Sequence, residues 1–194
     1  MVQLTDLPRI VALACHDLRT PLAAIHGFAR TLERAGELEA TQARYVGMIV
    51  AASEELGDIV DDLSLVGRLE SGRYEPTLQT VDSRRVAERA AELVGDDSVD
   101  VGGTGESVDV DVAATERAVA ALAEAARRHG GLERVRIDVA GRVLRLSPVA
   151  ESAAAVVLGE NLRDLGAAAA RALIEALGGS VSHEGDVVAV RLPA

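Results

Sequence analysis

The sequence has 194 residues, 48% of them hydrophobic, so it can bury one large core or two modest ones. Its formal net charge is −11 and it has no lysine, and the arginines are scattered among acidic residues, which argues against binding to a nucleic acid backbone. Aromatic residues make up 2% of the chain, too few for the stacking platforms that bind bases or sugars.

The single cysteine, Cys15, cannot form a disulfide within the chain, and we expect it to be a small packing residue. No apolar stretch near the N-terminus resembles a signal peptide or a membrane span. These features predict a cytoplasmic protein that binds neither nucleic acid nor membrane.

The first part of the chain predicts a long helical hairpin. Apolar residues recur every three or four positions over residues 10–32 and again over residues 45–69, and a helix breaker, Gly36, lies between the two runs. Two helices alone cannot bury their apolar faces, so we expect a second copy to complete a four-helix bundle in a homodimer. Gly and Pro within residues 71–76 end the second helix, which gives a hairpin domain at 1–75 and a second domain at 76–194.

The second domain mixes the periods of strands and helices. We expect strands at residues 77–81, 107–112, 134–139, 142–146, 180–183 and 187–192, and helices at 83–94, 113–129 and 165–177. The sequence GGTG at 102–105 lacks the lysine and the helix of a phosphate-binding loop, and we interpret it as a turn between strands. The sum predicts an α+β sandwich with helices on one face of a sheet.

The first helix carries His16 next to Asp17. In a helix, Thr20 lies one turn after His16 on the same face, and Arg19 lies close to that face. A neutral imidazole can attack phosphorus when an acceptor holds the proton of its other nitrogen, and Asp17 is the nearest acceptor. Pro21 cannot donate an amide proton to the carbonyl of Asp17, so the helix should bend just after this turn.

The string HDLRTPL at residues 16–22 resembles the phosphoacceptor box of bacterial sensor histidine kinases, H-[ED]-L-R-T-P-L. The string RLESGRYEP at residues 68–76 resembles the end of that family's dimerisation hairpin. The resemblance implies that His16 carries a phosphoryl group and that Asp17 is its acid/base partner. It also implies that Thr20 positions a water molecule that dephosphorylates a response regulator, and we place Arg19 in the same catalytic set.

The second domain resembles the ATP-binding sandwich of that family, but its nucleotide motifs depart from the family pattern. Ala120 and Glu124 stand where the family has asparagines that hold magnesium. The segment that corresponds to D-x-G-x-G contains no Asp, and Glu151 is the candidate replacement. Of the glycine-rich motif that follows, Gly166 alone keeps its position. We therefore expect a reduced ATPase-type fold that has lost its nucleotide contacts and binds no cofactor and no metal.

Within that family, the expected loss of nucleotide contacts most resembles the dimeric, kinase-shaped histidine phosphotransferases, which work without ATP. The leading hypothesis is a two-component phosphorelay protein that exchanges a phosphoryl group between His16 and receiver-domain aspartates, with phosphatase activity as an open addition. Its partners would be a response regulator receiver domain, which brings its own Mg²⁺, and an upstream histidine kinase. Two alternatives stay open: an active sensor-type histidine kinase with an unusual ATP site, and a non-catalytic scaffold that binds a kinase or response regulator.

A receiver is expected to dock on the bundle face below His16. The residues expected there are apolar side chains and the interhelical loop: Leu18, Leu22, Ile25 and the loop near Gly36. The other three histidines have no nucleophile or ligand pair at useful spacing and are predicted to lie at the surface or to cap helices: His26, His129 and His183. The acidic pairs at residues 61–62 and 96–97 are predicted to be solvated.

Overall fold

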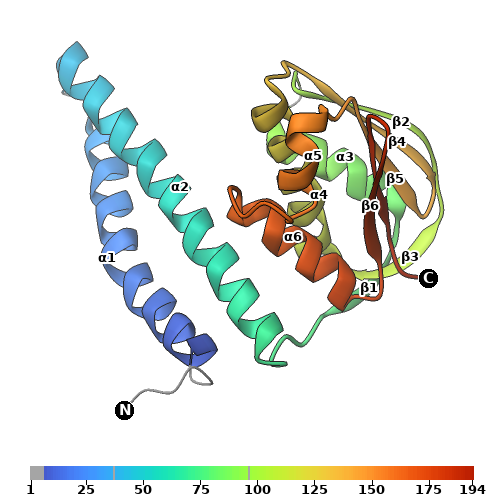
Figure 1. Ribbon diagram of the computed structural model, residues 1–194. Helices are drawn as coiled ribbons and strands as arrows, with labels where there is room; N and C mark the ends of the chain where they lie inside the picture. The colour runs from blue at the N-terminus through green and yellow to red at the C-terminus, as the bar shows by residue number, and fades with distance from the viewer. Residues whose placement is uncertain (1–6, 37, 96) are drawn as a thin grey trace. The chain divides into compact units, whose positions relative to one another are not determined.

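The computed structural model describes residues 7–36, 38–95 and 97–194. The chain divides into two compact units, Met1–Arg73 and Tyr74–Ala194, which are drawn in Figure 1. None of the helices within these described ranges combines the length and the apolar character needed to cross a membrane.

The first unit is a hairpin of two helices, α1 (Leu7–Ala35) and α2 (Ala40–Glu70), which lie side by side in Figure 1. Helix α1 continues through Pro21 and ends before Gly36, whose positive φ of 69° is a conformation that favours glycine. At the start of α2, the backbone amide of Glu39 donates to Gln42 Oε1 over 3.0 Å. The predicted helical hairpin is confirmed.

The residues that are buried in the hairpin are small or β-branched. The buried residues of the two helices are Cys15, Ala29, Val46, Val50, Ser53, Val60 and Gly67. Cys15 is completely buried, which confirms its prediction as a packing residue. Many large apolar side chains of the hairpin remain exposed, among them Ile10, Leu13, Leu18, Ile25, Phe28 and Leu32 on α1 and Tyr45, Met48, Ile49, Leu56 and Ile59 on α2. The hairpin therefore has a second apolar face that it cannot cover by itself.

The second unit contains two sheets. Strands β1 (Leu78–Asp82) and β3 (Ser107–Asp111) form an antiparallel pair. Among the described residues, the main sheet has the order β2-β4-β5-β7-β6, in which β2 and β4 are parallel and the other neighbouring strands are antiparallel. Its strands are β2 (Val99–Gly105), β4 (Val135–Gly141), β5 (Val143–Ser147), β6 (Ser180–Glu184) and β7 (Val187–Arg191).

On one side of this sheet lie the described helices α3 (Ser83–Val94), α4 (Val112–Gly130), α5 (Glu151–Val157) and α6 (Leu165–Ala176), and α5 packs against α4 and α6 (Figure 1). Between the layers is an aliphatic core whose largest fully buried side chains include Leu122, Ile137, Leu144, Leu146, Leu173 and Ile174. The predicted α+β sandwich is confirmed.

The prediction of a turn at GGTG is wrong, because these residues belong to strand β2. Gly103 lies opposite Val139 of β4 and has a φ of 85°, and a Cβ on it would collide with the carbonyl oxygen of Val139. The glycines therefore permit a close approach of two parallel strands. Helix α5 was also not predicted, since its short run of alanine and valine has no clear helical period.

Candidate functional site

His16 and Asp17 lie together on α1 and both face solvent. Their side chains are 80% and 69% exposed, and His16 Nδ1 lies 3.2 Å from Asp17 Oδ1. When the imidazole proton is on Nδ1, His16 donates this hydrogen bond and Nε2 keeps its lone pair. The arrangement therefore provides an accessible nitrogen nucleophile whose other nitrogen is held by a carboxylate.

Arg19 connects this region of α1 to α2. Its Nη2 donates a hydrogen bond to Asp61 Oδ1 over 2.9 Å. Asp61 is thus 44% exposed on the helix face and is also an ion-pair partner, which the sequence did not predict. The reason is the antiparallel register of the hairpin, which brings residue 61 opposite residue 19. Of the other predicted solvated acids, Asp97 is exposed and Asp96 lies outside the described residues.

A groove of about 280 Å³ runs between the two helices next to this ion pair. It is lined by Arg19, Leu22, Ala23, His26, Ser53, Gly57 and Asp61. His26 is half-buried there, with its Nδ1 3.0 Å from Ser53 Oγ, and Ser53 Oγ in turn donates to the Val50 carbonyl over 2.7 Å. His26 therefore bridges the helices, and the prediction of a surface or capping role for it is wrong.

The remaining residues predicted on α1 lie around the same turns. Thr20 and Pro21 are exposed, and Thr20 lies one turn after His16. Leu18 and Ile25 are exposed apolar side chains, while Leu22 lines the groove. The structure thus brings the predicted catalytic and docking residues of α1 into one region of the hairpin.

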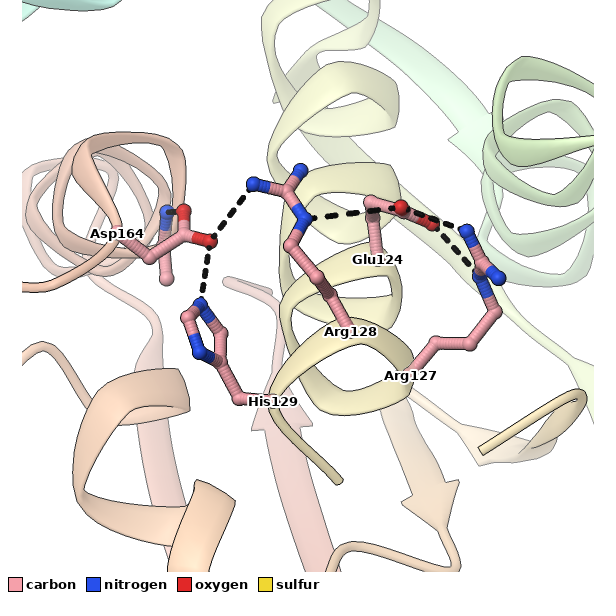
Figure 2. Close-up of polar contacts among 6 residues, drawn as sticks. Glu124, Arg127, Arg128, His129 and Asp164 are labelled. Carbon is pink, nitrogen blue, oxygen red and sulfur yellow. Dashed lines mark hydrogen bonds and ion pairs between the residues drawn. The ribbon is translucent and has the colours of Figure 1, made fainter. Parts of the chain in front are cut away.

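The residues predicted at a nucleotide position lie on α4. Ala120 is buried, and the Glu124 carboxylate receives two hydrogen bonds from Arg127, at 2.7 and 2.9 Å (Figure 2). Arg128 Nε lies 3.8 Å from the same carboxylate. The hydrogen bond with Glu124, followed by the charge of Glu124, raises the pKa of Arg127 above its ordinary value, so this guanidinium stays charged.

Asp164 connects the end of α4 to the start of α6. Its Oδ1 accepts from the backbone amide of Ala167 at 3.0 Å, which caps α6. Its Oδ2 lies 3.0 Å from His129 Nε2 and 3.6 Å from Arg128 Nη1 (Figure 2). The side chain of Asp164 is only 9% exposed. Gly166 follows in the first turn of α6.

Asp164 is not among the residues predicted from the sequence, although an Asp just before an apolar helix is a recognisable N-cap signal. His129 was expected at the surface or as a cap, and it bonds to the capping residue of another helix. His183 lies half-buried in β6.

Three positions of α4 and α5, Ala120, Glu124 and Glu151, are those that the family resemblance assigns to the nucleotide. Ala120 has no ligand atom, and the Glu124 carboxylate is already held by the Arg127 guanidinium. Glu151, the candidate for an adenine contact, is exposed in the first turn of α5. Within the part of the chain that the structure describes, no three or more His, Cys, Asp or Glu side chains are grouped so that they could hold a metal ion.

A family model matches the hairpin, and two sensor kinases match part of the chain. Residues 8–72 match the family model of the His Kinase A (phospho-acceptor) domain. The chain is 39% identical over 69 residues to the probable sensor histidine kinase TcrY of Mycobacterium tuberculosis, which covers 36% of this chain and 14% of that protein. It is 31% identical over 88 residues to the histidine protein kinase DivJ of Caulobacter vibrioides, which covers 44% of this chain and 15% of that protein. The matched region thus spans only a small part of these curated relatives.

Two solved structures resemble the chain over most of its length. Full-length ShkA in complex with AMPPNP has a TM-score of 0.67 at 23% identity, over 94% of this chain and 44% of that one. The histidine kinase AdeS of Acinetobacter baumannii has a TM-score of 0.60 at 20% identity, over 92% of this chain and 97% of that one. At these identities the likeness establishes the fold. The match over residues 8–72 thus identifies the hairpin as a His Kinase A (phospho-acceptor) domain, and the two solved structures show that the chain has the fold found in these histidine kinases, which supports a two-component system protein.

Proposed function

We propose that this protein is a cytoplasmic phosphorelay histidine phosphotransferase that exchanges a phosphoryl group between His16 and receiver-domain aspartates without using ATP. The observation that carries the proposal is the exposed His16, whose Nδ1 lies 3.2 Å from the Asp17 carboxylate. An exposed nucleophile suits a donor that arrives on another protein, because the receiver's aspartyl phosphate must reach the imidazole directly.

In the proposed step, His16 Nε2 attacks the phosphorus of the receiver's aspartyl phosphate. The N–P bond forms while the P–O bond to the aspartate breaks, and the aspartate leaves as a carboxylate. Asp17 accepts the hydrogen bond from the Nδ1 proton and stabilises the positive charge that develops on the imidazole. The reverse step passes the phosphoryl group to a second receiver, and each receiver supplies its own Mg²⁺.

Arg19 and Thr20 have separate roles in this proposal. Arg19 offers its guanidinium to the phosphoryl group, since it lies within one turn of His16. Thr20, exposed on the face of His16, positions a water molecule that hydrolyses the receiver's phosphate. The same hairpin would then support both phosphotransfer and dephosphorylation. An upstream histidine kinase would load the first receiver.

The ion pairs of the Glu124 carboxylate support a mechanism without ATP. Its carboxylate is paired with Arg127 and lies within 3.8 Å of Arg128, so a magnesium ion would have to displace these cations. The names of the relatives favour a second candidate function, an active autokinase, because TcrY and DivJ are both called histidine kinases.

Labelling the wild-type protein distinguishes the two candidates. We expect no label from radiolabelled ATP with magnesium, and acid-labile label from receiver domains that have been phosphorylated with labelled acetyl phosphate. The panel should include the receivers encoded in the same genome. Uptake of label from ATP would show an autokinase and contradict the proposal. Uptake from neither source, with receiver binding intact, would favour a non-catalytic scaffold.

We propose further that the chain works as a homodimer. The exposed apolar side chains of α1 and α2 would be covered by the same face of a second hairpin, which gives a four-helix bundle. A carboxylate introduced on this face would be buried in the dimer without a partner.

Leu56→Asp is therefore expected to weaken dimerisation at least about 100-fold. Sedimentation equilibrium measures the result, with twice the 20.2 kDa of one chain expected for the wild type. Leu93→Asp on α3 is the matched control, since Leu93 is 56% exposed and Leu56 is 52% exposed. A monomeric wild type, or equal effects of the two variants, would argue against this interface.

A further inference from the structure

Asp61 is an acidic residue of α2 that no sequence motif singles out, and its Oδ1 accepts a hydrogen bond from Arg19 Nη2 over 2.9 Å. We propose that Asp61 is a positioning residue for phosphoryl transfer, which holds the Arg19 guanidinium beside His16 so that it can bind the transferring phosphoryl group. The inference rests on the proposed function of His16.

The position of Asp61 on the neighbouring helix limits the conformations that the Arg19 side chain adopts. Arg19 lies three residues after His16, so the two side chains leave α1 within one turn of each other. An arginine side chain has many rotamers, and a carboxylate on the neighbouring helix selects those that cross from α1 to α2. Gly57, one turn before Asp61, has no side chain and lines the groove between the two residues' helices. Arg19 and Asp61 line the same groove.

The hydrogen bond between the two residues leaves Arg19 available for chemistry. The bond uses Nη2, which is one part of a guanidinium with five N–H donors. The remaining donors can bind phosphoryl oxygens while the Asp61 contact persists. Holding the cation in place before the donor arrives lowers the cost of ordering it in the transition state.

Solvent exposure argues against a mainly structural role for this ion pair. The side chains of Arg19 and Asp61 are 50% and 44% exposed, and exposed ion pairs contribute little to stability. The hairpin is held together by its buried aliphatic contacts. A change at Asp61 should therefore alter the rate of transfer far more than the stability of the fold.

The test measures transfer from the phosphorylated receiver domain that labels the wild-type chain fastest, with rapid quenching over receiver concentrations that extend to saturation. Asp61→Ala is expected to lower the transfer rate about tenfold and to leave the half-saturating receiver concentration unchanged. Asp61→Asn keeps an acceptor oxygen and should stay within about threefold of the wild type. Asp58→Ala is the matched control, because it removes an exposed carboxylate from α2 one turn earlier.

A double substitution separates positioning from other effects. If Asp61 acts through Arg19, then Arg19→Ala/Asp61→Ala should transfer no more slowly than Arg19→Ala alone. Additive losses in the double variant, or an Asp61→Ala protein as fast as the wild type, would overturn the inference while leaving the proposed function intact. A wild-type chain that takes no label from any phosphorylated receiver would overturn the proposed function and this inference with it.

Discussion

His16→Ala is expected to abolish uptake of the phosphoryl group from a phosphorylated receiver, with a loss of at least about 10³-fold. The substitution removes the nitrogen that forms the N–P bond, and alanine offers no other nucleophile. The His16 side chain is 80% exposed, so the free energy of unfolding should change by no more than about 0.5 kcal/mol. The measurement is acid-labile label on the chain after incubation with labelled phospho-receiver.

His26→Ala is the control for this experiment. His26 also lies on α1, but it is half-buried and bonded to Ser53, so we expect it to have no part in the chemistry. Retained label in His26→Ala, with loss in His16→Ala, would assign the modification to one histidine. Label that persists in His16→Ala would falsify the site assignment. Circular dichroism of both variants tests that the hairpin remains folded.

Gly103→Ala is expected to destabilise the α/β unit by about 2–5 kcal/mol. The φ of 85° at this position is unfavourable for any residue with a Cβ, at a cost of about 1–2 kcal/mol. The new Cβ would also collide with the backbone of Val139 in β4, and this overpacking adds about 1–3 kcal/mol. Urea unfolding followed by circular dichroism gives the change in free energy.

Gly185→Ala separates the two costs of that substitution. Gly185 lies between β6 and β7 with a φ of 64°, and a Cβ there would meet nothing within 4 Å. It should therefore lose only the conformational part, about 1–2 kcal/mol. Equal losses in Gly103→Ala and Gly185→Ala would mean that β2 and β4 separate easily and that the close approach is unimportant.

The fold was most predictable where one period persists along the chain. In the hairpin and in helix α4, apolar residues recur over many turns. A repeat of this length fits the period of a helix and does not fit that of a strand. Strand β2 was missed because its glycines are equally typical of turns. Their role in β2 depends on the backbone of β4, which begins 30 residues after β2 ends.

In the candidate site, too, contacts between sequence neighbours are predictable and contacts between the two helices are not. His16 and Asp17 are neighbours in sequence, so the local spacing alone predicts that their side chains can meet. Arg19 and Asp61 are separated by 42 positions, and the turn between α1 and α2 sets the register that joins them. Such a pairing follows from tertiary packing, which local patterns do not encode.

By itself, the sequence determined the helical hairpin, the α+β class of the second unit and the His16 box, because these depend on periodicity and on contacts within one helical turn. Only the tertiary structure decided that Asp61 holds Arg19 and that Asp164 joins α4 to α6. The physical reason is that a charged side chain on a helix can reach several oppositely charged side chains. Packing fixes which of them comes within hydrogen-bonding distance.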